Sequence, residues 1–329
     1  MPNVAIVGAT GAVGQEFLKI LAERKFPVDE LRLLATKRSA GRMIEWQGRQ
    51  LEVQETTKES FQGIDIALFA GGSASTEYAP AAVRSGAIVI DNSSAFRLEP
   101  EVPLVVPEVN PEDVRGHRGI IANPNCSTII MVVALKPILD LAGIRRVVVS
   151  TYQAVSGAGR EGIEELETQL RNWVNGGELV SQVFPYQIAF NLIPRIDVFQ
   201  EGDYTKEEWK MVKETRKIFH TPELAITATT VRVPVLRSHS ESINIETESK
   251  ISVQEARDAL AKAPGVIVVD NPAADSYPMP WYSADTDEVY VGRIREDFSI
   301  AQGLNLWVVG DQIRKGAATN AVQIAELLL

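Results

Sequence analysis

The chain lacks the residues that a disulfide-bonded, zinc-binding or membrane-spanning protein needs. Only one of its 329 residues is a cysteine, so no disulfide framework can form, and no zinc-ligand spacing occurs. No apolar run approaches the ~20 residues of a membrane-spanning helix. Met1 leads almost directly into a predicted strand, so we expect no signal peptide. Together these absences predict a cytoplasmic protein with no membrane association and no bound metal.

Positive charge is also scarce. The chain has 33 Lys and Arg residues against 43 Asp and Glu residues, which gives a net charge of −10. This balance argues against nucleic acids and anionic membranes as partners. An anionic small substrate would therefore need arginine or lysine side chains gathered locally. The length and the ordinary hydrophobic content of 45% suggest a globular protein of two domains.

The single cysteine, Cys126, lies within the segment Asn123–Thr128. Residues 119–122 before it form an apolar run that predicts a strand, and residues 128–135 after it are apolar on every side and predict a buried helix. Because Asn-Pro-Asn favours a turn, we predict that the thiol lies where the strand becomes the helix. A helix N-terminus favours a thiolate, so we interpret Cys126 as a nucleophile; the alternative is a small buried residue.

A nucleophilic thiol needs a base, because an unperturbed thiol is only ~3% ionised at pH 7 and a helix dipole shifts its pKa by less than about one unit. The chain has three histidines. His117 lies in a basic loop, His220 ends a helical pattern, and His239 follows a β-branched run. By elimination His239 is the predicted partner of Cys126. The alternative is a hydrogen-bonded histidine at a strand end.

A glycine-rich segment follows the first predicted strand, residues 4–7. Gly8, Gly11 and Gly14 have the spacing G-x-x-G-x-x-G, and a helical pattern begins directly after them. Strand, glycine loop and helix in this order are typical of dinucleotide binding, because glycines let the backbone approach a pyrophosphate at the helix N-terminus. The alternative is a tight turn that binds nothing.

The end of the second predicted strand, residues 31–35, favours NADP over NAD. An NAD site usually places an acid here for the ribose hydroxyl, but the nearest acids precede the strand. Lys37, Arg38 and Ser39 instead offer hydrogen-bond donors where a 2′-phosphate would lie. The alternative is a solvated basic loop.

Strands and helices alternate through the first part of the chain. Strands at 64–70 and 87–90 flank a helix at about 75–84, which predicts a parallel, doubly wound sheet. Ligands of such sheets gather at the carboxyl ends of the strands. Arg97 follows one of these ends, so it is either an anion-binding residue or an exposed surface arginine.

The second part of the chain predicts an α+β domain with a largely antiparallel sheet. The apolar face of a helix at about 160–175 is expected to lie in a core or an interface. Ser252 and Glu255 form a predicted capping box before another helix. The predicted strands are 146–153, 224–236, 241–247, 266–270, 288–295 and 303–309.

The segments Gly8–Gly14, Asn123–Thr128 and Arg232–His239 together resemble the aspartate-semialdehyde dehydrogenases, over nearly the whole chain. Asp91–Arg97, Gln153 and the Glu-Glu-Trp-Lys sequence 207–210 belong to the same resemblance. It implies a Rossmann-type NADP-binding domain over residues 1–125, completed by a C-terminal helix, 311–329. It also implies a catalytic and dimerisation domain over residues 126–310, and a homodimer.

The resemblance assigns a role to each candidate residue. Cys126 forms the acyl-enzyme and His239 is its acid and base. Gln153 positions the acyl group, Arg232 binds the substrate carboxylate and Glu207 its amino group, and Arg97 and Lys210 bind phosphate. The implied NADP contacts are Gly8, Thr10, Gly11, Ala12, Val13, Arg38, Ser39, Ser156, Gly157 and Gln312.

The implied reaction is the NADPH-dependent reductive dephosphorylation of 4-phospho-L-aspartate to L-aspartate 4-semialdehyde, with release of inorganic phosphate. It belongs to the biosynthesis of lysine, threonine, methionine and isoleucine from aspartate. One alternative is an N-acetyl-glutamyl-phosphate reductase, whose blocked amine would give Glu207 nothing to bind. Another is a non-catalytic dinucleotide-binding relative, against which Cys126 and His239 argue.

The spacing between Arg232 and His239 conflicts with a site built on one regular strand. Arg232 and His239 are seven residues apart, and an odd spacing places two residues on opposite faces of a regular strand. We therefore expect the strand to bend or end between them, at Pro234 or Ser238.

Overall fold

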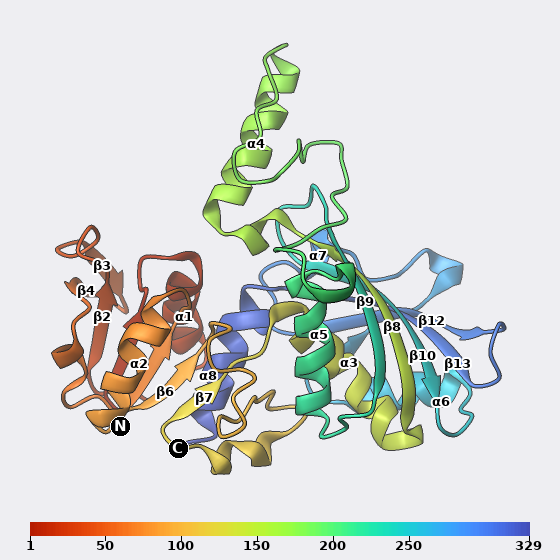
Figure 1. The fold of residues 1–329 in the computed structure, drawn as a ribbon, viewed down its shortest axis with the longest axis horizontal. Coiled ribbons are helices and arrows are strands. Elements are labelled where there is room, and N and C mark those ends of the chain that lie inside the picture. The colour runs from red at the N-terminus through yellow and green to blue at the C-terminus, as the bar shows by residue number, and fades with distance from the viewer. The chain divides into compact units, whose positions relative to one another are not determined.

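The computed structural model describes residues 1–329 as two compact units (Figure 1). Unit 1 comprises Met1–Asn125 and Gly316–Leu329, and unit 2 comprises Cys126–Lys315. The returning C-terminal segment is thus shorter than the predicted 311–329, because residues 311–315 belong to unit 2. No helix is long and apolar enough to cross a membrane.

A seven-stranded sheet forms the middle of unit 1, in the order β3-β4-β2-β1-β5-β6-β7. All neighbouring strands are parallel except β3 and β4, which pair antiparallel. The strands are β1 (Val4–Val7), β2 (Leu31–Ala35), β3 (Met43–Trp46), β4 (Arg49–Glu55), β5 (Ile66–Phe69), β6 (Ile88–Asp91) and β7 (Ile120–Ala122).

Helices cover both faces of this sheet, as the predicted doubly wound fold requires. Because side chains alternate along a strand, Val4 and Ile6 of β1 enter one apolar core and Ala5 and Val7 the other. The first core is shared with α1 and α8, and the second with α2. The helical segments are α1 (Ala12–Glu23), α2 (Ala74–Arg84), α8 (Thr319–Glu326) and the turns η1 (Lys58–Phe61) and η2 (Pro111–Gly116). The π-helical turn η6 (Arg314–Ala318) begins in unit 2 and ends in unit 1.

The hairpin formed by β3 and β4 is absent from the sequence-based prediction. Its two-residue turn is Gln47–Gly48, with φ values of 49° and 76°. Two consecutive positive φ values define the turn type that usually carries Asn-Gly or Asp-Gly, and glutamine in the first position hides the signal.

Unit 2 contains a six-stranded sheet in the order β11-β12-β13-β10-β8-β9. Strand β10 pairs antiparallel with β8 and β13, and β12 with β13, whereas β9 and β11 join the two edges in parallel. The prediction of a largely antiparallel sheet is confirmed. The strands are β8 (Ile144–Gln153), β9 (Ala225–Arg232), β10 (His239–Thr247), β11 (Val266–Val268), β12 (Val289–Asp297) and β13 (Gly303–Gly310).

The buried helix of unit 2 is α3 (Cys126–Ala142), which packs against β8, β10, β12 and β13. After Cys126, its side chains are buried on all sides from Ser127 to Leu135, as its uniformly apolar sequence predicts. The predicted capping box of Ser252 and Glu255 is also confirmed. The remaining helical segments are α4 (Arg160–Val174), α5 (Lys206–Ile218), α6 (Val253–Lys262), α7 (Pro280–Ser283), η3 (Val155–Ala158), η4 (Glu201–Asp203) and η5 (Pro272–Ala274).

One predicted strand is too long. Strand β9 ends at Arg232 rather than at residue 236, and β10 begins at His239 rather than at 241. After Val233 donates its N–H to the carbonyl of Gln153, Pro234 has no N–H with which to continue the ladder. The chain therefore leaves the sheet between Arg232 and His239.

Candidate active site

Cys126 and His239 meet at the start of α3. The predicted position of the thiol at a helix start is confirmed, because α3 begins at Cys126. The Sγ of Cys126 lies 3.6 Å from Nε2 of His239, within hydrogen-bonding distance for sulfur. The thiol is partly exposed, whereas His239 is fully buried. A reactive cysteine needs this combination of access and a nearby polar partner.

Three neighbouring strands place Gln153, Arg232 and His239 in one row. Gln153 of β8 is the Cα partner of Arg232 in β9. On the other side of β8, Tyr152 pairs with Ser240 of β10, so the next step brings Gln153 opposite His239. Residues in line across a sheet share a face. The odd spacing is therefore no obstacle, because Arg232 and His239 lie on two strands with β8 between them.

The tautomer of His239 follows from its backbone contact. The N–H of Ala154 donates to Nδ1 of His239 at 3.1 Å. Since a backbone N–H only donates, Nδ1 accepts, and the neutral ring carries its proton on Nε2, the nitrogen nearest Cys126. Burial, followed by the nearby positive charge of Arg232, lowers the pKa of His239 to about 3, although Glu207 opposes the shift. His239 is therefore neutral at neutral pH.

Arg232 is a buried guanidinium held by a backbone carbonyl. Its Nη1 donates to the carbonyl oxygen of Ala154 at 2.6 Å, and its Cζ lies 5.8 Å from the centre of the Phe184 ring. Burial lowers its pKa, while Glu207 and Cys126 oppose the change. A planar, desolvated guanidinium of this kind suits a carboxylate.

Gln153 connects the row to helix α5. Its Oε1 accepts from the hydroxyl of Thr151 at 3.0 Å, and its Nε2 donates to Oε1 of Glu207 at 3.2 Å. The same Nε2 lies 3.4 Å from Nε2 of His239. The other carboxylate oxygen of Glu207 pairs with Lys210 at 2.9 Å, and Lys210 also reaches Asp197 at 3.3 Å. Charged residues in the first turn of a helix are usually solvated, but Glu207 is buried.

Arg97 belongs to unit 1, where it is buried rather than exposed at the surface. Its Nε donates to the carbonyl of Asn123 at 2.9 Å, and its Nη2 donates to the carbonyl of Asn92 at 2.8 Å. The Asn123 side chain bridges Asn92 and Asn320. The segment after β6 and the segment after β7 are therefore fixed to each other within unit 1, as their shared sheet edge predicts.

The glycine loop of unit 1 has the geometry that a dinucleotide needs. Gly8 has φ +86°, and a Cβ on Gly14 would lie 2.2 Å from the carbonyl oxygen of Gly8, so the turn tolerates only glycine there. Helix α1 has no side-chain hydrogen bond at its N-cap, Gly11, which leaves its first N–H groups available to a phosphate. Ala12 and Val13 form the first turn of this helix.

The predicted 2′-phosphate segment lies at the same edge of that sheet. The hydroxyl of Thr10 donates to the hydroxyl of Ser39 at 3.3 Å, which joins the loop after β1 to the loop after β2. Ser39 is buried and Arg38 is exposed. These residues fit a phosphate-bearing ribose.

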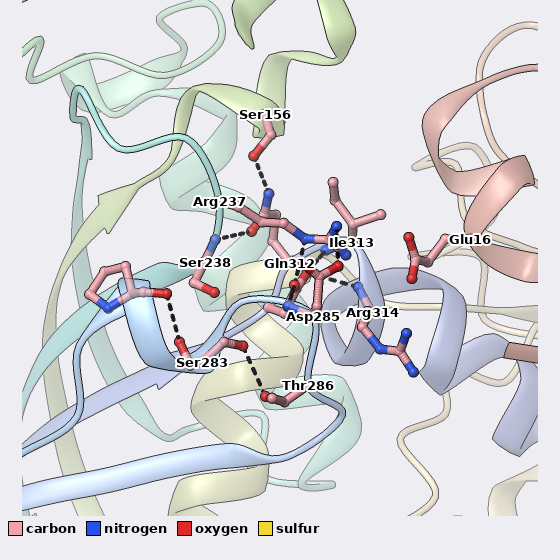
Figure 2. A network of polar contacts seen from close by, with 12 residues as sticks. Glu16, Ser156, Arg237, Ser238, Ser283, Asp285, Thr286, Gln312, Ile313 and Arg314 are labelled. Carbon is pink, nitrogen blue, oxygen red and sulfur yellow. Dashed lines mark hydrogen bonds and ion pairs between the residues drawn. The ribbon is translucent and has the colours of Figure 1, made fainter. Parts of the chain in front are cut away.

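The remaining predicted cofactor residues lie in unit 2 and contact each other. Figure 2 shows the amide of Gln312 between the hydroxyl of Ser156 and the backbone of Ser238. Gly157 follows Ser156, and a Cβ on Gly157 would lie 3.3 Å from Cε1 of His239. Ser156, Gly157 and Gln312 therefore lie next to His239.

Sequence reasoning missed three groups of the site. The backbone of Ala154 holds both His239 and Arg232, Thr151 orients Gln153, and Asp197 pairs with Lys210. A backbone amide has no sequence signal. The spacing of Thr151, two residues before Gln153 on one strand face, is the only available hint. No group of three or more His, Cys, Asp or Glu side chains could hold a metal ion.

A thiol beside a buried histidine, in a chain that also carries a nucleotide-type glycine loop, defines a dehydrogenase that uses a nicotinamide dinucleotide. The chain belongs to the semialdehyde dehydrogenase family. The family's NAD binding domain matches residues 3–117, and its dimerisation domain matches residues 135–315.

Known proteins of this family resemble the whole chain. The aspartate-semialdehyde dehydrogenase of Aquifex aeolicus is 62% identical over 332 residues, which cover 99% of this chain and 98% of the relative. The crystal structure of aspartate semialdehyde dehydrogenase II of Vibrio cholerae complexed with ASA has a TM-score of 0.96 at 50% identity, covering 100% of this chain and 98% of that one. The enzyme of Candida albicans with NADP has a TM-score of 0.76 at 27% identity, covering 100% and 98%. Neither predicted alternative, the N-acetyl-glutamyl-phosphate reductase or the non-catalytic relative, is favoured by these matches.

Proposed function

We propose that the protein converts 4-phospho-L-aspartate into L-aspartate 4-semialdehyde through a thioester on Cys126, in the synthesis of amino acids from aspartate. The observation that carries this proposal is the 3.6 Å contact between the Cys126 thiol and His239, at the end of the row that contains Gln153 and Arg232. The resemblance to aspartate-semialdehyde dehydrogenases, including the Vibrio cholerae enzyme complexed with ASA, supports the same substrate.

The first step is an acyl transfer to Cys126. The thiolate attacks the carbonyl carbon of the acyl phosphate, the C–S bond forms, and the C–O bond to phosphate breaks. The thiol has lost a proton before the attack and the departing phosphate takes one up, so acylation releases no net proton. The covalent thioester splits one difficult displacement into two easier steps.

His239 acts as the proton-bearing group of this step. Its neutral ring holds the Nε2 hydrogen toward Cys126, because Nδ1 is occupied by the Ala154 N–H. In this form it stabilises the thiolate and then the negative oxygen that develops on the substrate carbonyl. Its role as a base needs the Ala154 contact to open, because Nδ1 must then carry a hydrogen as well.

The charges around Gln153 suit a substrate with an ammonium, a carboxylate and a phosphate. Arg232 presents a planar guanidinium to the carboxylate. The half-buried ion pair of Glu207 and Lys210 offers one carboxylate and one ammonium at 2.9 Å, so the substrate ammonium would pair with Glu207 and its phosphate with Lys210. Arg97, in unit 1, is the second proposed phosphate-binding cation.

The proposed cofactor is NADP, and the structure of the Candida albicans enzyme with NADP supports this choice. Thr10, Gly11, Ala12 and Val13 would hold the pyrophosphate, and Arg38 with Ser39 would hold the 2′-phosphate. When bound, the nicotinamide supplies the hydride that reduces the acyl group. Arg38→Ala should raise the KM for NADP far more than the KM for NAD, whereas the neighbouring exposed Arg42→Ala should change neither. Equal efficiency of the unmutated protein with both dinucleotides would refute the choice of NADP.

The catalytic pair is tested by the phosphate-dependent reduction of NADP with aspartate semialdehyde. Cys126→Ser should abolish turnover, because a hydroxyl is hardly ionised at pH 7. His239→Asn should be slower by ~10²–10⁴-fold, the usual worth of general acid–base help, with little change in KM. The control is His220→Asn, since His220 is exposed and its φ of 54° is one that asparagine tolerates. Full turnover in His239→Asn would remove this histidine from the mechanism.

We also propose that two copies pair through unit 2. Helix α4 carries exposed apolar side chains, among them Leu170 and Trp173, and the centre of the Trp173 ring lies 4.9 Å from that of the exposed Phe190 ring, with the two rings tilted by 59°. A two-fold dimer is the commonest way to cover such a face. Sedimentation of a monomer at micromolar concentration would contradict a homodimer.

A further inference from the structure

The residue directly before His239 has an unusual backbone. Ser238 has a φ of 72°, a left-handed value that residues other than glycine rarely adopt. Its side chain is fully buried and its hydroxyl has no hydrogen-bond partner. Ser238 therefore does not hold this conformation through its own side chain, and neighbouring groups must hold it.

Those groups follow strand β13. His239 and Gly310 are Cα partners in the ladder, so Asp311 and Gln312 lie directly beyond the partner of the histidine. Figure 2 shows the side chain of Gln312 reaching across to Ser238, the residue before His239. Oε1 of Gln312 accepts from the N–H of Ser238 at 2.9 Å. Its Nε2 donates to the hydroxyl of Ser156, so one amide ties together the two backbone segments that flank the imidazole.

The buried carboxylate of Asp311 fixes the residue before Ser238. Its Oδ2 accepts from Nε of Arg237 at 2.6 Å and from the N–H of Asp285 at 2.7 Å. Its Oδ1 accepts from the N–H groups of Ile313 and Arg314, at 2.9 and 3.1 Å. Arg237 also pairs with the carboxylate of Asp285 at 2.7 Å. Four donors around one carboxylate leave it a single orientation.

We propose that Asp311 and Gln312 are positioning residues of the reaction, which act through Arg237 and Ser238 to place the imidazole of His239 against the thiol. The proposal rests on the function proposed above for the histidine. The contact they protect joins Nε2 to Sγ at 3.6 Å, so a displacement of the ring by ~1 Å takes the two atoms beyond hydrogen-bonding distance. The proposed substrate-binding side chains lie on β8, on β9, on α5 and, for Arg97, in unit 1, so a loss of positioning should lower kcat rather than raise KM.

The test uses Asp311→Asn, which keeps the size of the side chain. All four neighbours of the carboxylate are donors, so an amide must turn its own N–H groups toward at least one of them in either orientation. The matched control is Asp270→Asn. Asp270 is an equally buried acid that pairs with Arg257 at 2.7 Å and accepts from the backbone of Ile294, away from the start of β10.

The first readout is alkylation of the single cysteine, Cys126, in the unliganded protein as a function of pH. If Asp311→Asn removes one pKa unit of thiolate stabilisation, alkylation at pH 7 falls about tenfold and its midpoint moves to higher pH. The second readout is turnover. A ring displaced by ~1 Å should lower kcat by roughly ten- to hundredfold, with KM for aspartate semialdehyde nearly unchanged. Asp270→Asn should lower the melting temperature similarly but leave both readouts unchanged.

Several outcomes would overturn the proposal. Wild-type alkylation and kcat in folded Asp311→Asn would refute it, and so would an equal loss of kcat in Asp270→Asn. If Asp311→Asn does not fold, Arg237→Lys removes the Nε donor while keeping the charge, and the same two results apply to it. Normal turnover in His239→Asn would instead refute the function proposed for the histidine, so the two failures can be told apart.

Discussion

A methyl group added to Gly157 should disturb the carboxylate site without disturbing the backbone. Gly157 does not have a left-handed φ, so alanine can adopt its conformation. Its Cβ would lie 2.6 Å from Nη1 of Arg232, and 3.3 and 3.4 Å from Cε1 and Nε2 of His239. The close approach of this turn to the two side chains explains why a residue without a side chain stands here.

The size of the effect follows from the position of Arg232. Its Nη1 must withdraw by about 0.8 Å, from 2.6 Å to an ordinary contact of about 3.4 Å, and it is tethered to the carbonyl of Ala154 at 2.6 Å. Arg232 is only 6% exposed, so it has little room to move. A misplacement of ~1 Å can cost ~10²-fold in rate, which corresponds to ~2.7 kcal/mol of transition-state stabilisation.

We therefore expect Gly157→Ala to lower kcat/KM for aspartate semialdehyde by about 100-fold, mainly through KM. Steady-state kinetics with both substrates varied give the result, and the KM for the dinucleotide shows how much of the loss comes from the cofactor. Gly116→Ala is the control, because its Cβ would meet open space and its φ is ordinary. A wild-type KM in Gly157→Ala would show that Arg232 does not bind the substrate carboxylate.

Three further predictions concern the buried charges of unit 2. Arg232→Lys should keep the melting temperature but lower kcat/KM by roughly 10–100-fold, because an ammonium cannot replace a paired guanidinium–carboxylate contact worth ~1.5–3 kcal/mol; unchanged kinetics would place the carboxylate elsewhere. Burial, with Arg232 nearby, lowers the pKa of His239 from 6.5 to about 3. The neutral imidazole therefore contributes fully to the free energy of unfolding above pH 6.5. This contribution is lost by about 1.4 kcal/mol per pH unit as the pH falls toward 3. Urea unfolding at a series of pH values should show that the free energy of unfolding falls more steeply below pH 6.5 in the wild type than in His239→Gln. Parallel plots of this free energy against pH would refute the prediction. Burial also raises the pKa of Glu241 well above 4.5, so stability present below pH 4.5 is lost as the pH rises. In the same assay the free energy of unfolding of Glu241→Gln should not fall as the pH rises above 4.5. If Glu241→Gln and the wild type have the same dependence on pH, the carboxyl group of Glu241 is hydrated.

Local features of the fold were predictable because they depend on neighbours in the sequence. The glycine loop, the alternation of strands and helices, the buried helix α3 and the capping box at Ser252 all follow from periodicity and turn chemistry within about twenty residues. The position of Cys126 at a helix start belongs to this group, since the Asn-Pro-Asn turn and the apolar run after it are adjacent. The resemblance to the family rests on the same contiguous segments.

The arrangement of the site was decided by the tertiary structure. Register across β9, β8 and β10 aligns Arg232, Gln153 and His239, and no spacing within one strand predicts which strands become neighbours. Glu207 looks like a solvated helix residue until α5 packs its carboxylate against Gln153. The tautomer of His239 depends on the backbone N–H of Ala154, a donor that every residue except proline carries. The sequence by itself determined which chemical groups are present and which local elements carry them; long-range strand pairing and burial determined which of those groups meet and which are charged.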